Sequence, residues 1–256
     1  MGSQLPICAK NLNRVPGWFW PLDQALFRVF LAESRRIVGR GDLAEIGTYF
    51  GKSAILIGSS LAPGETFTVV DLFGSPADDI ENNEENARNY GKLTEQRFRS
   101  KYLEFHDSLP VIVHGSSSII ANRASHGTHR FVHVDGSHLY EHVKTDVEST
   151  RTLSAPQGVV VFDDIRSEHT PGVPAAVWAA IDRGLNPIAL SPAKLYATWG
   201  DPRPWVRFLD TWSSEPNCEI KFHTEIQRIA GQSVYRFSMA RSWITRKLIE
   251  LDSRRH

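Results

Sequence analysis

Apolar positions recur along this chain in two alternating patterns, one typical of helices and the other of strands. Residues 21–38 and 52–60 carry apolar side chains at helical spacing. Residues 42–47 and 66–73 form short apolar runs bounded by turn residues, which is typical of strands. Pro63-Gly64 ends the second helical segment before the second strand. The order strand, loop, helix, strand predicts a βαβ unit with a right-handed crossover.

The same alternation continues toward the C-terminus. It predicts strands over 110–115, 131–135, 159–163, 219–226 and 233–238, and helices over 82–101, 140–153, 171–184, 204–212 and 241–251. Strands that alternate with helices form a mostly parallel α/β sheet. We find no repeat or linker, and 256 residues with 41% hydrophobic content suffice for one core. We therefore expect a single domain over 1–256, with a helical cap over 1–40, the core over 41–240 and a helical tail over 241–256.

A glycine-containing turn joins the first strand to the next helix. In Glu45-Ile-Gly-Thr-Tyr-Phe-Gly-Lys-Ser53, Gly47 and Gly51 let the backbone approach a ligand, and the helix that follows offers free amide hydrogens. The spacing matches neither a dinucleotide fingerprint nor a P-loop, so a plain structural turn is the alternative. Asp71 ends the following strand, where a carboxylate can bind both hydroxyls of a ribose. Together these features favour an adenosine-type cofactor.

Two apolar runs end abruptly in acidic residues. Asp135 follows residues 131–134, Asp163 and Asp164 follow residues 159–162, and His138 lies three positions after Asp135. Because the carboxyl ends of parallel strands meet at one crevice, these side chains are expected to converge. Carboxylates crowded together repel one another unless a cation lies between them. The pattern predicts a hard divalent metal with a base beside it, although a helix cap or turn is the alternative for Asp163-Asp164.

Composition narrows the classes of partner and compartment. The chain has 29 basic and 29 acidic residues, so no net charge draws it toward nucleic acid or an anionic membrane. Two cysteines are too few for a disulfide framework. No apolar run approaches the roughly 20 residues that span a bilayer. We expect a cytoplasmic protein with no nucleic-acid partner and no membrane span.

Four motifs carry a resemblance to a known family. Residues 45–53, the acidic end of 69–71, residues 135–140, and residues 161–164 with Pro171-Gly172-Val173 downstream resemble class I S-adenosylmethionine-dependent methyltransferases. The chain is similar to their metal-dependent, sugar-modifying branch, which includes macrolide sugar O-methyltransferases and the mycobacterial 3-O-methylmannose polysaccharide 1-O-methyltransferase. The resemblance implies a Rossmann-like, doubly wound, mostly parallel sheet with an N-terminal helical extension and an antiparallel C-terminal strand.

The resemblance also implies a role for each matching residue. The implied cofactor-binding residues are Glu45, Gly47, Thr48, Gly51, Ser53, Asp71, His114, Gly115, Ser116, Ser117 and Asp135. Asp135, Asp163 and Asp164 are the implied ligands of Mg²⁺ or another divalent cation, and His138 is the implied general base, with His142 as the other candidate. The implied reaction is methyl transfer from S-adenosylmethionine to a hydroxyl of a small-molecule or oligosaccharide acceptor, as in polysaccharide biosynthesis.

Several alternatives stay open at this stage. A catechol or small-phenol O-methyltransferase uses the same metal chemistry, and a non-catalytic cofactor-binding scaffold keeps the fold. Trp18, Phe19 and Trp20 form either a stacking surface for a sugar or an anchor for the N-terminal helix. Residues 78–95 form either a lid over the substrate or a solvated helix. The sequence also leaves a homodimer open.

Overall fold

The computed structural model describes residues 7–77, 80–81, 83, 93–213 and 222–239. The strands are β1 (Asp42–Ile46), β2 (Phe67–Asp71), β3 (Val111–His114), β4 (His129–Val134), β5 (Ser154–Phe162), β6 (Asn186–Leu190), β7 (Leu195–Thr198), β8 (Phe222–Ile229) and β9 (Gln232–Met239). The α-helices are α1 (Ala9–Leu12), α2 (Pro21–Val38), α3 (Lys52–Gly58), α5 (Glu95–Leu103), α6 (Tyr140–Leu153), α7 (Gly172–Ala179) and α8 (Arg203–Trp212). Two 3₁₀ turns, η1 (Ser117–Asn122) and η2 (Ile181–Arg183), complete the described elements.

These strands form one mixed sheet in the order β3-β2-β1-β4-β5-β7-β6-β9-β8. The first five pair in parallel, β7 runs antiparallel to both β5 and β6, and β8 and β9 form an antiparallel hairpin. The expected α/β fold, with a mostly parallel sheet and antiparallel C-terminal strands, is confirmed. The sheet changes winding direction between β1 and β4, which is where open α/β sheets bind their ligands.

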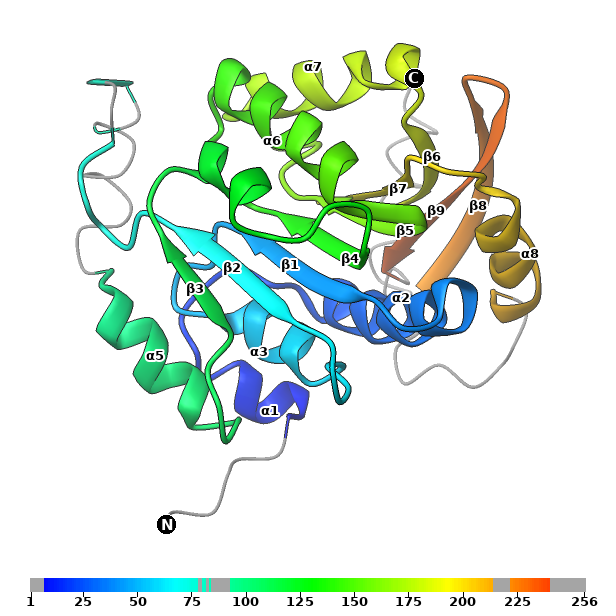
Figure 1. Ribbon diagram of the computed structural model, residues 1–256. Helices are drawn as coiled ribbons and strands as arrows, with labels where there is room; N and C mark the ends of the chain where they lie inside the picture. The colour runs from blue at the N-terminus through cyan, green and yellow to red at the C-terminus, as the bar shows by residue number, and fades with distance from the viewer. Residues whose placement is uncertain (1–6, 78–79, 82, 84–92, 214–221, 240–256) are drawn as a thin grey trace, which may run out of the picture.

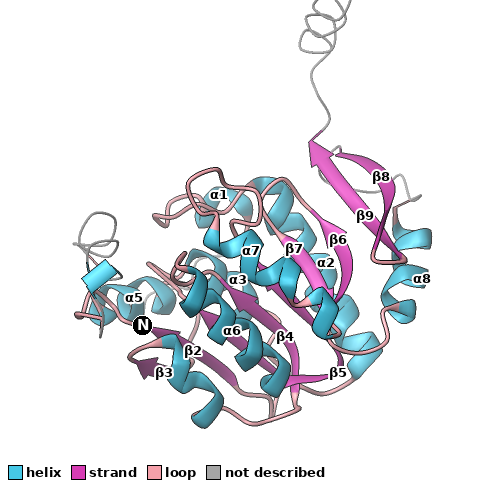
Figure 2. Ribbon diagram, turned by 90° about the horizontal axis from the view of Figure 1, so that it is seen from above, coloured by secondary structure: helices cyan, strands magenta, loops and turns pink. Residues whose placement is uncertain are grey.

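Helices cover both faces of the sheet (Figures 1 and 2). In Figure 1, α6 and α7 lie on one side, whereas α2, α3 and α5 lie on the other. The cause is the two-residue period of the strands, which sends successive side chains to opposite faces. Leu43, Phe131 and Val159 join the core beneath α2 and α3, while the adjacent Ala44 and Val132 join the core beneath α6 and α7.

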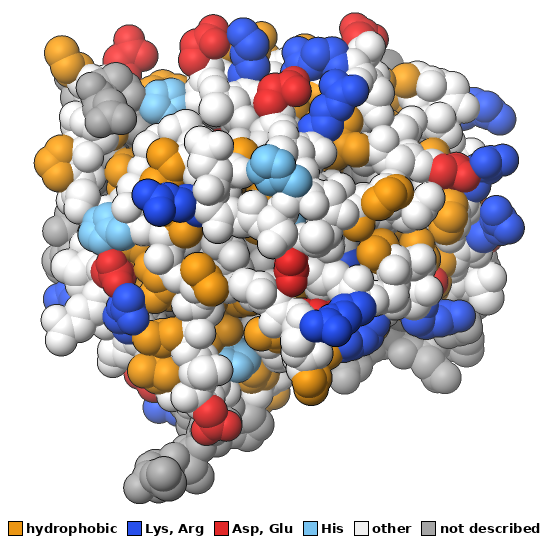
Figure 3. All heavy atoms as spheres, viewed as in Figure 1, with side chains coloured by type: hydrophobic (Ala, Val, Ile, Leu, Met, Phe, Trp, Pro, Cys, Tyr) orange, Lys and Arg blue, Asp and Glu red, His pale blue; other side chains and the backbone are white. Residues whose placement is uncertain are grey.

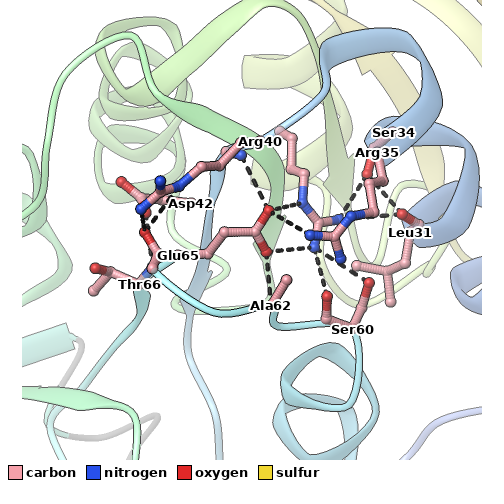
Figure 4. A network of polar contacts seen from close by, with 12 residues as sticks. Leu31, Ser34, Arg35, Arg40, Asp42, Ser60, Ala62, Glu65 and Thr66 are labelled. Atoms are coloured by element: carbon pink, nitrogen blue, oxygen red, sulfur yellow. Dashed lines mark hydrogen bonds and ion pairs between the residues drawn. The ribbon is translucent and has the colours of Figure 1, made fainter.

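An irregularity in β4 places a buried arginine on the same side as α2. The pairing of β4 with β5 shifts register between His129 and Phe131, and Arg130 at this point is 0% exposed. Its guanidinium pairs with Glu65 at 3.1 Å and donates to the carbonyl oxygens of Leu31 and Ser60. Figure 4 shows Glu65 at the centre of this network, which connects α2 and the loop before β2 to the amino end of β4.

The sequence predictions agree with this fold except in a few segments. The helix expected over 171–184 ends at Ala179 and continues as η2, and the β6–β7 hairpin was not predicted. Of the helix expected over 82–101, the structure describes Asn83 as helical and then α5 from Glu95, where the Thr94 side chain caps it. Residues 78–79, most of 82–92, 219–221 and the helix expected over 241–251 lie outside the described residues.

The surface carries charges of both signs in close alternation. In Figure 3, Lys and Arg side chains lie among Asp and Glu side chains across the visible face. This distribution agrees with 29 basic and 29 acidic residues. The helices in the described part of the chain are too short or too polar to cross a bilayer.

Candidate active site

The strand register brings the predicted acidic residues to one level of the sheet. Ile46 pairs with Val70 and Val134, and Val134 pairs with Phe162. The next residue of each strand therefore lies in one row, formed by Gly47, Asp71, Asp135 and Asp163. Backbone hydrogen bonds continue through this row, from the amide of Asp135 to Ile46 at 2.7 Å and from that of Asp163 to Val134 at 2.9 Å. The sequence expectation that these residues converge agrees with this register.

A cavity of about 450 Å³ opens directly above this row. This volume lies within the usual range for small-molecule sites. The predicted site residues in its wall are Gly47, Thr48, Ser53, Asp71, Gly115, Ser116, Ser117, Asp135, His138, Asp163 and Asp164. His142, His169 and Lys194 line the same cavity. One cavity therefore holds the implied cofactor residues together with the implied metal and base residues.

The glycine turn after β1 is held against its neighbours by Asp71. One carboxylate oxygen of Asp71 accepts hydrogen bonds from the amides of Thr48 and Tyr49, at 2.7 and 3.0 Å, and the other accepts from the amide of Phe73. Gly47 has a φ of +77°, and a Cβ there would lie 2.0 Å from the carbonyl oxygen of Asp135. Only glycine lets the turn approach β4 this closely. Binding of a ribose diol by Asp71 stays a prediction, because its oxygens already organise the turn.

Three of the implied cofactor residues do not line the cavity. Glu45 is buried behind the cavity wall, and Gly51 caps α3 in the left-handed region, where a Cβ would lie 2.9 Å from Phe98. His114 is exposed on the other side of β3 and contacts Glu95 at 2.7 Å and Ser75 at 2.8 Å. The packing explains the type of residue at Gly51 without any ligand.

His138 and Asp164 form a pair in the cavity wall. The Nε2 atom of His138 lies 2.9 Å from Asp164 Oδ2, and the Ser167 hydroxyl donates to Asp164 Oδ1. Burial raises the pKa of Asp164, but the contacts from His138 and Ser167 outweigh burial and leave this pKa below its ordinary value. Asp164 has a φ of +54°, a conformation that costs energy in a residue other than glycine. The turn after β5 is therefore strained where it presents this carboxylate.

A buried polar chain lies beneath the aspartates. The Lys194 ammonium contacts Asp163 Oδ2 and lies 3.2 Å from His133 Nε2, while His133 Nδ1 lies 2.7 Å from Glu45 Oε1. Burial raises the pKa of Glu45 and lowers that of His133 well below its ordinary value, and the nearby Lys194 charge lowers the pKa of His133 further. His133 is therefore neutral, accepts from Lys194 at Nε2 and donates to Glu45 from Nδ1.

Asp135 has an unfavourable electrostatic environment. Burial raises the pKa of its carboxyl well above the ordinary value, and the neighbouring Asp163 and Asp164 raise it further. Lys194 acts in the opposite direction on the pKa of Asp135. The carboxylates at the ends of β4 and β5 thus carry more negative charge than this lysine can balance.

Comparisons with known proteins agree with this geometry. Residues 44–165 match a family model described as a methyltransferase domain. The structure of the O-methyltransferase NovP aligns with a TM-score of 0.55 and 20% identity, over 69% of this chain and 80% of NovP. The chain has a methyltransferase fold. A Corynebacterium glutamicum protein aligns with a TM-score of 0.52 and 15% identity, over 77% of this chain and 92% of that protein. Among curated protein sequences, none matched the chain.

Within this methyltransferase fold, the residues present fit a divalent cation. Asp135, Asp163 and Asp164 offer hard oxygen donors to one cavity, and a cation there would relieve their mutual repulsion. Ligand atoms of His133, Asp135 and Asp163 lie within 4.8 Å of one another, whereas Asp164 lies outside this group among the described residues. We exclude His133 as a ligand because both ring nitrogens already have partners, Glu45 and Lys194. An ion at the three aspartates would share Asp163 with Lys194.

The N-terminal segment builds the outer wall of the cavity in this methyltransferase fold. Phe19 is buried in the core, whereas Trp18 and Trp20 are 70% and 62% exposed and line the cavity. Trp18 stacks on Tyr49 with ring centroids 5.7 Å apart, and Lys52 donates to the Gly17 carbonyl at 2.9 Å. The segment therefore serves both readings made from the sequence, because Phe19 anchors it while the two tryptophans offer aromatic surface.

Sequence reasoning did not single out Lys194. The β6–β7 hairpin around it was missed because residues 186–198 form one apolar run that prolines interrupt. A signal was nevertheless present, since Lys194 is the sole charged residue between Asn186 and Trp199. A lone charge inside an apolar run is buried with a partner or marks a site. The antiparallel pairing of Leu195 with Phe162 places Lys194 next to Asp163.

Proposed function

We propose that the protein is an S-adenosylmethionine-dependent O-methyltransferase that methylates a hydroxyl of a carbohydrate with the help of a divalent metal. The observation that carries the proposal is the row of Gly47, Asp71, Asp135 and Asp163 beneath one cavity, within residues that match a methyltransferase domain. The cofactor supplies a methyl group on a sulfonium, so the protein must chiefly align an oxygen behind that methyl group.

The chain provides two groups of residues in the cavity wall, one for the cofactor and one for the acceptor. Gly47 and Thr48, on the turn held by Asp71, line the cavity together with Ser116 and Ser117 at the start of η1. His138 and the aspartates after β4 and β5 line the same cavity. We assign the first group to the cofactor and the second to the reacting hydroxyl. A methyl donor and an acceptor bound in one cavity have the proximity that transfer requires.

His138 is the proposed general base. A sugar hydroxyl is a poor nucleophile while protonated, so a group in the cavity must accept its proton. The Asp164 carboxylate 2.9 Å from His138 Nε2 orients the ring and stabilises the charge that the ring acquires on accepting the proton. A divalent ion held by Asp135, Asp163 and Asp164 would lower the pKa of an acceptor hydroxyl in contact with it.

The exposed tryptophans support a carbohydrate acceptor. Trp18 and Trp20 present aromatic faces at the cavity mouth, and such faces suit the C–H side of a pyranose ring. A flat catechol could stack on the same surface, so the carbohydrate preference rests mainly on the resemblance of the motifs to sugar-modifying enzymes. We also propose that the acceptor is a small molecule or an oligosaccharide and that the protein acts in the cytoplasm.

The test is methyl transfer from S-adenosylmethionine to panels of sugars, oligosaccharides and catechols, each with Mg²⁺ and with a chelator. We expect turnover with a sugar that stops in chelator and returns with Mg²⁺. Turnover with catechols alone would show that the acceptor is a phenol and not a carbohydrate. Full activity in chelator would show that the reaction needs no metal. Tight binding of S-adenosylhomocysteine without turnover of any acceptor would favour the scaffold alternative.

A further inference from the structure

Lys194 lies at the point where three parts of the fold meet. It follows a tight turn after β6, in which the Ser191 hydroxyl oxygen accepts from the Lys194 amide at 2.9 Å. Its side chain is almost fully buried, in contact with Asp163 after β5 and 3.2 Å from His133 on β4. A buried lysine is stable only when carboxylates compensate its charge. Lys194 is therefore tied to the same carboxylates that face the cavity.

Aromatic rings close the other side of the lysine. The ammonium lies 5.7 Å from the ring centroids of both Phe19 and Phe27. Asp23, on α2, is also fully buried, and its charge acts on Lys194 together with those of Asp163 and Asp135. This surrounding holds the ammonium between the aromatic rings and the carboxylates.

We propose that Lys194 is a built-in counter-cation that shares the carboxylate cluster with the metal: it holds Asp163 in place before the metal binds, and its charge weakens metal binding. The inference rests on the proposed function, because the metal is that of the proposed active site. Lys194 is a positioning residue in this view, since it acts on the metal through Asp163. Lys194 supplies one positive charge, and an exchangeable ion would balance the remaining negative charge of the three aspartates.

The charge balance of the cluster supports this role. Asp135, Asp163 and Asp164 carry up to three negative charges, against one positive charge on Lys194. A like charge held against the same carboxylate repels a bound cation and lowers its affinity. Removal of the lysine should thus increase the affinity for a divalent cation by at least about tenfold, provided that Asp163 stays in place.

The experiment measures binding of Mn²⁺ alone to the full chain by calorimetry, with no cofactor or acceptor. We compare the wild-type protein with Lys194→Met, and record thermal unfolding in chelator and at saturating Mn²⁺. We expect Lys194→Met to unfold at a lower temperature in chelator, to bind Mn²⁺ at least about tenfold more tightly, and to gain more from Mn²⁺ than the wild type does. The ion then replaces the missing charge.

Two control variants separate this effect from general damage. Lys52→Met removes another cavity lysine, whose ammonium binds the Gly17 carbonyl rather than a carboxylate, and should leave Mn²⁺ affinity within about twofold. Arg130→Met damages the core at the far end of β4 and should gain no more stability from Mn²⁺ than the wild type does. If Lys194→Met does not fold in chelator, the double variant Asp163→Asn/Lys194→Met removes both charges, and recovery of folding supports the proposal.

The outcomes are distinct for each part of the argument. Equal Mn²⁺ affinity in the wild type and Lys194→Met, or weaker binding in the variant, overturns the shared-charge role. A double variant no more stable than Lys194→Met also overturns it. If the wild type binds no Mn²⁺ but Lys194→Met does, the metal dependence in the proposed function is contradicted, whereas the role of Lys194 is supported. If neither protein binds Mn²⁺, both fail.

Discussion

Strand β4 carries a buried charged network at each end, and the two networks differ in how completely they are paired. At the amino end, Arg130 faces Glu65, and the carboxylate also accepts from the amides of Gly41 and Ala62. Burial raises the pKa of Glu65, but the hydrogen bonds from Arg130 and from both amides outweigh it and leave the pKa lowered. At the carboxyl end, Asp135 lacks comparable compensation, and its pKa is raised.

The difference separates a structural network from a functional one. In Figure 4 the Glu65 carboxylate lies among basic side chains, and the labelled residues are not part of the wall of the cavity above Asp135, so these groups have little left to offer a ligand. The aspartates above Lys194 open to a cavity and exceed the available positive charge. Strongly perturbed groups that line a cavity are candidates for function, whereas similar groups sealed in a core are usually structural.

The largest effect is expected at the carboxyl end of β4. Asp135→Asn replaces one of the three charged oxygen donors by a neutral amide while keeping the shape of the side chain. We expect metal-dependent turnover to be abolished and Mn²⁺ affinity to fall by more than about 100-fold, the upper value for losing a partner outside the ligand set. Affinity for S-adenosylhomocysteine should be partly retained. Calorimetry with each ligand checks both, and unchanged Mn²⁺ binding would contradict the ligand assignment.

The next effect concerns the proton acceptor. His138→Ala should lower the single-turnover rate by roughly 10² to 10⁴, the usual contribution of a general base, while substrate binding changes much less. His169→Ala and His142→Ala are matched controls, because both histidines line the same cavity. A normal rate in His138→Ala with a slow rate in His142→Ala would move the base to His142.

At the amino end of β4, the expected effect is on stability alone. Arg130→Met leaves Glu65 buried without its main partner, which costs about 3–5 kcal/mol of the free energy of unfolding. Arg35→Met, at the partly exposed pair with the same carboxylate, should cost less than about 1 kcal/mol. Urea unfolding measures both. The contrast between the ends of β4 fails if Arg130→Met weakens Mn²⁺ binding as strongly as Asp135→Asn does.

A last effect, on the pH dependence of stability, extends the comparison to a third buried acid. Asp146 on α6 is fully buried. Burial raises its pKa to about 7, against a smaller opposing effect of the Ser117 side chain. The folded protein then binds this proton more tightly than the unfolded chain, so its contribution to stability is present below about pH 4 and is lost as the pH rises to about 7.

Asp146→Asn should remove this pH dependence. The loss in the wild type amounts to up to roughly 4 kcal/mol at about 1.4 kcal/mol per pKa unit. Urea unfolding at a series of pH values from about 4 to 8 measures the slope for both proteins. Equal slopes would show that Asp146 ionises normally in the folded state.

Much of the fold was predictable because its signals are local. The helices over 21–38 and 140–153 agree with α2 and α6 at both ends, since apolar periodicity and the residues at their ends mark them clearly. The β6–β7 hairpin was missed because Pro187 and Pro192 interrupt a run without alternation. Pairing with β5 on one side and β9 on the other, not local preference, makes these residues strands.

The candidate site was predictable only where it follows strand ends. Asp71, Asp135 and Asp163 come directly after apolar runs, and parallel strands bring such positions to one level. Glu45 lies inside β1 and not after it. Its side chain therefore faces His133 within the core, below the level of the cavity. Lys194 reaches the cluster from the turn before the antiparallel strand β7, and no sequence spacing relates it to Asp163.

The irregularity at Arg130 determines which residues of β4 face α2. Because the register shift lies before Phe131, Arg130 and the alternating pair His133 and Asp135 all face the side of α2. Deleting a single residue between Phe131 and Val134 would keep the arginine anchored but rotate the imidazole and the carboxylate toward α6. The length of this short segment therefore determines which face of the sheet carries His133 and Asp135.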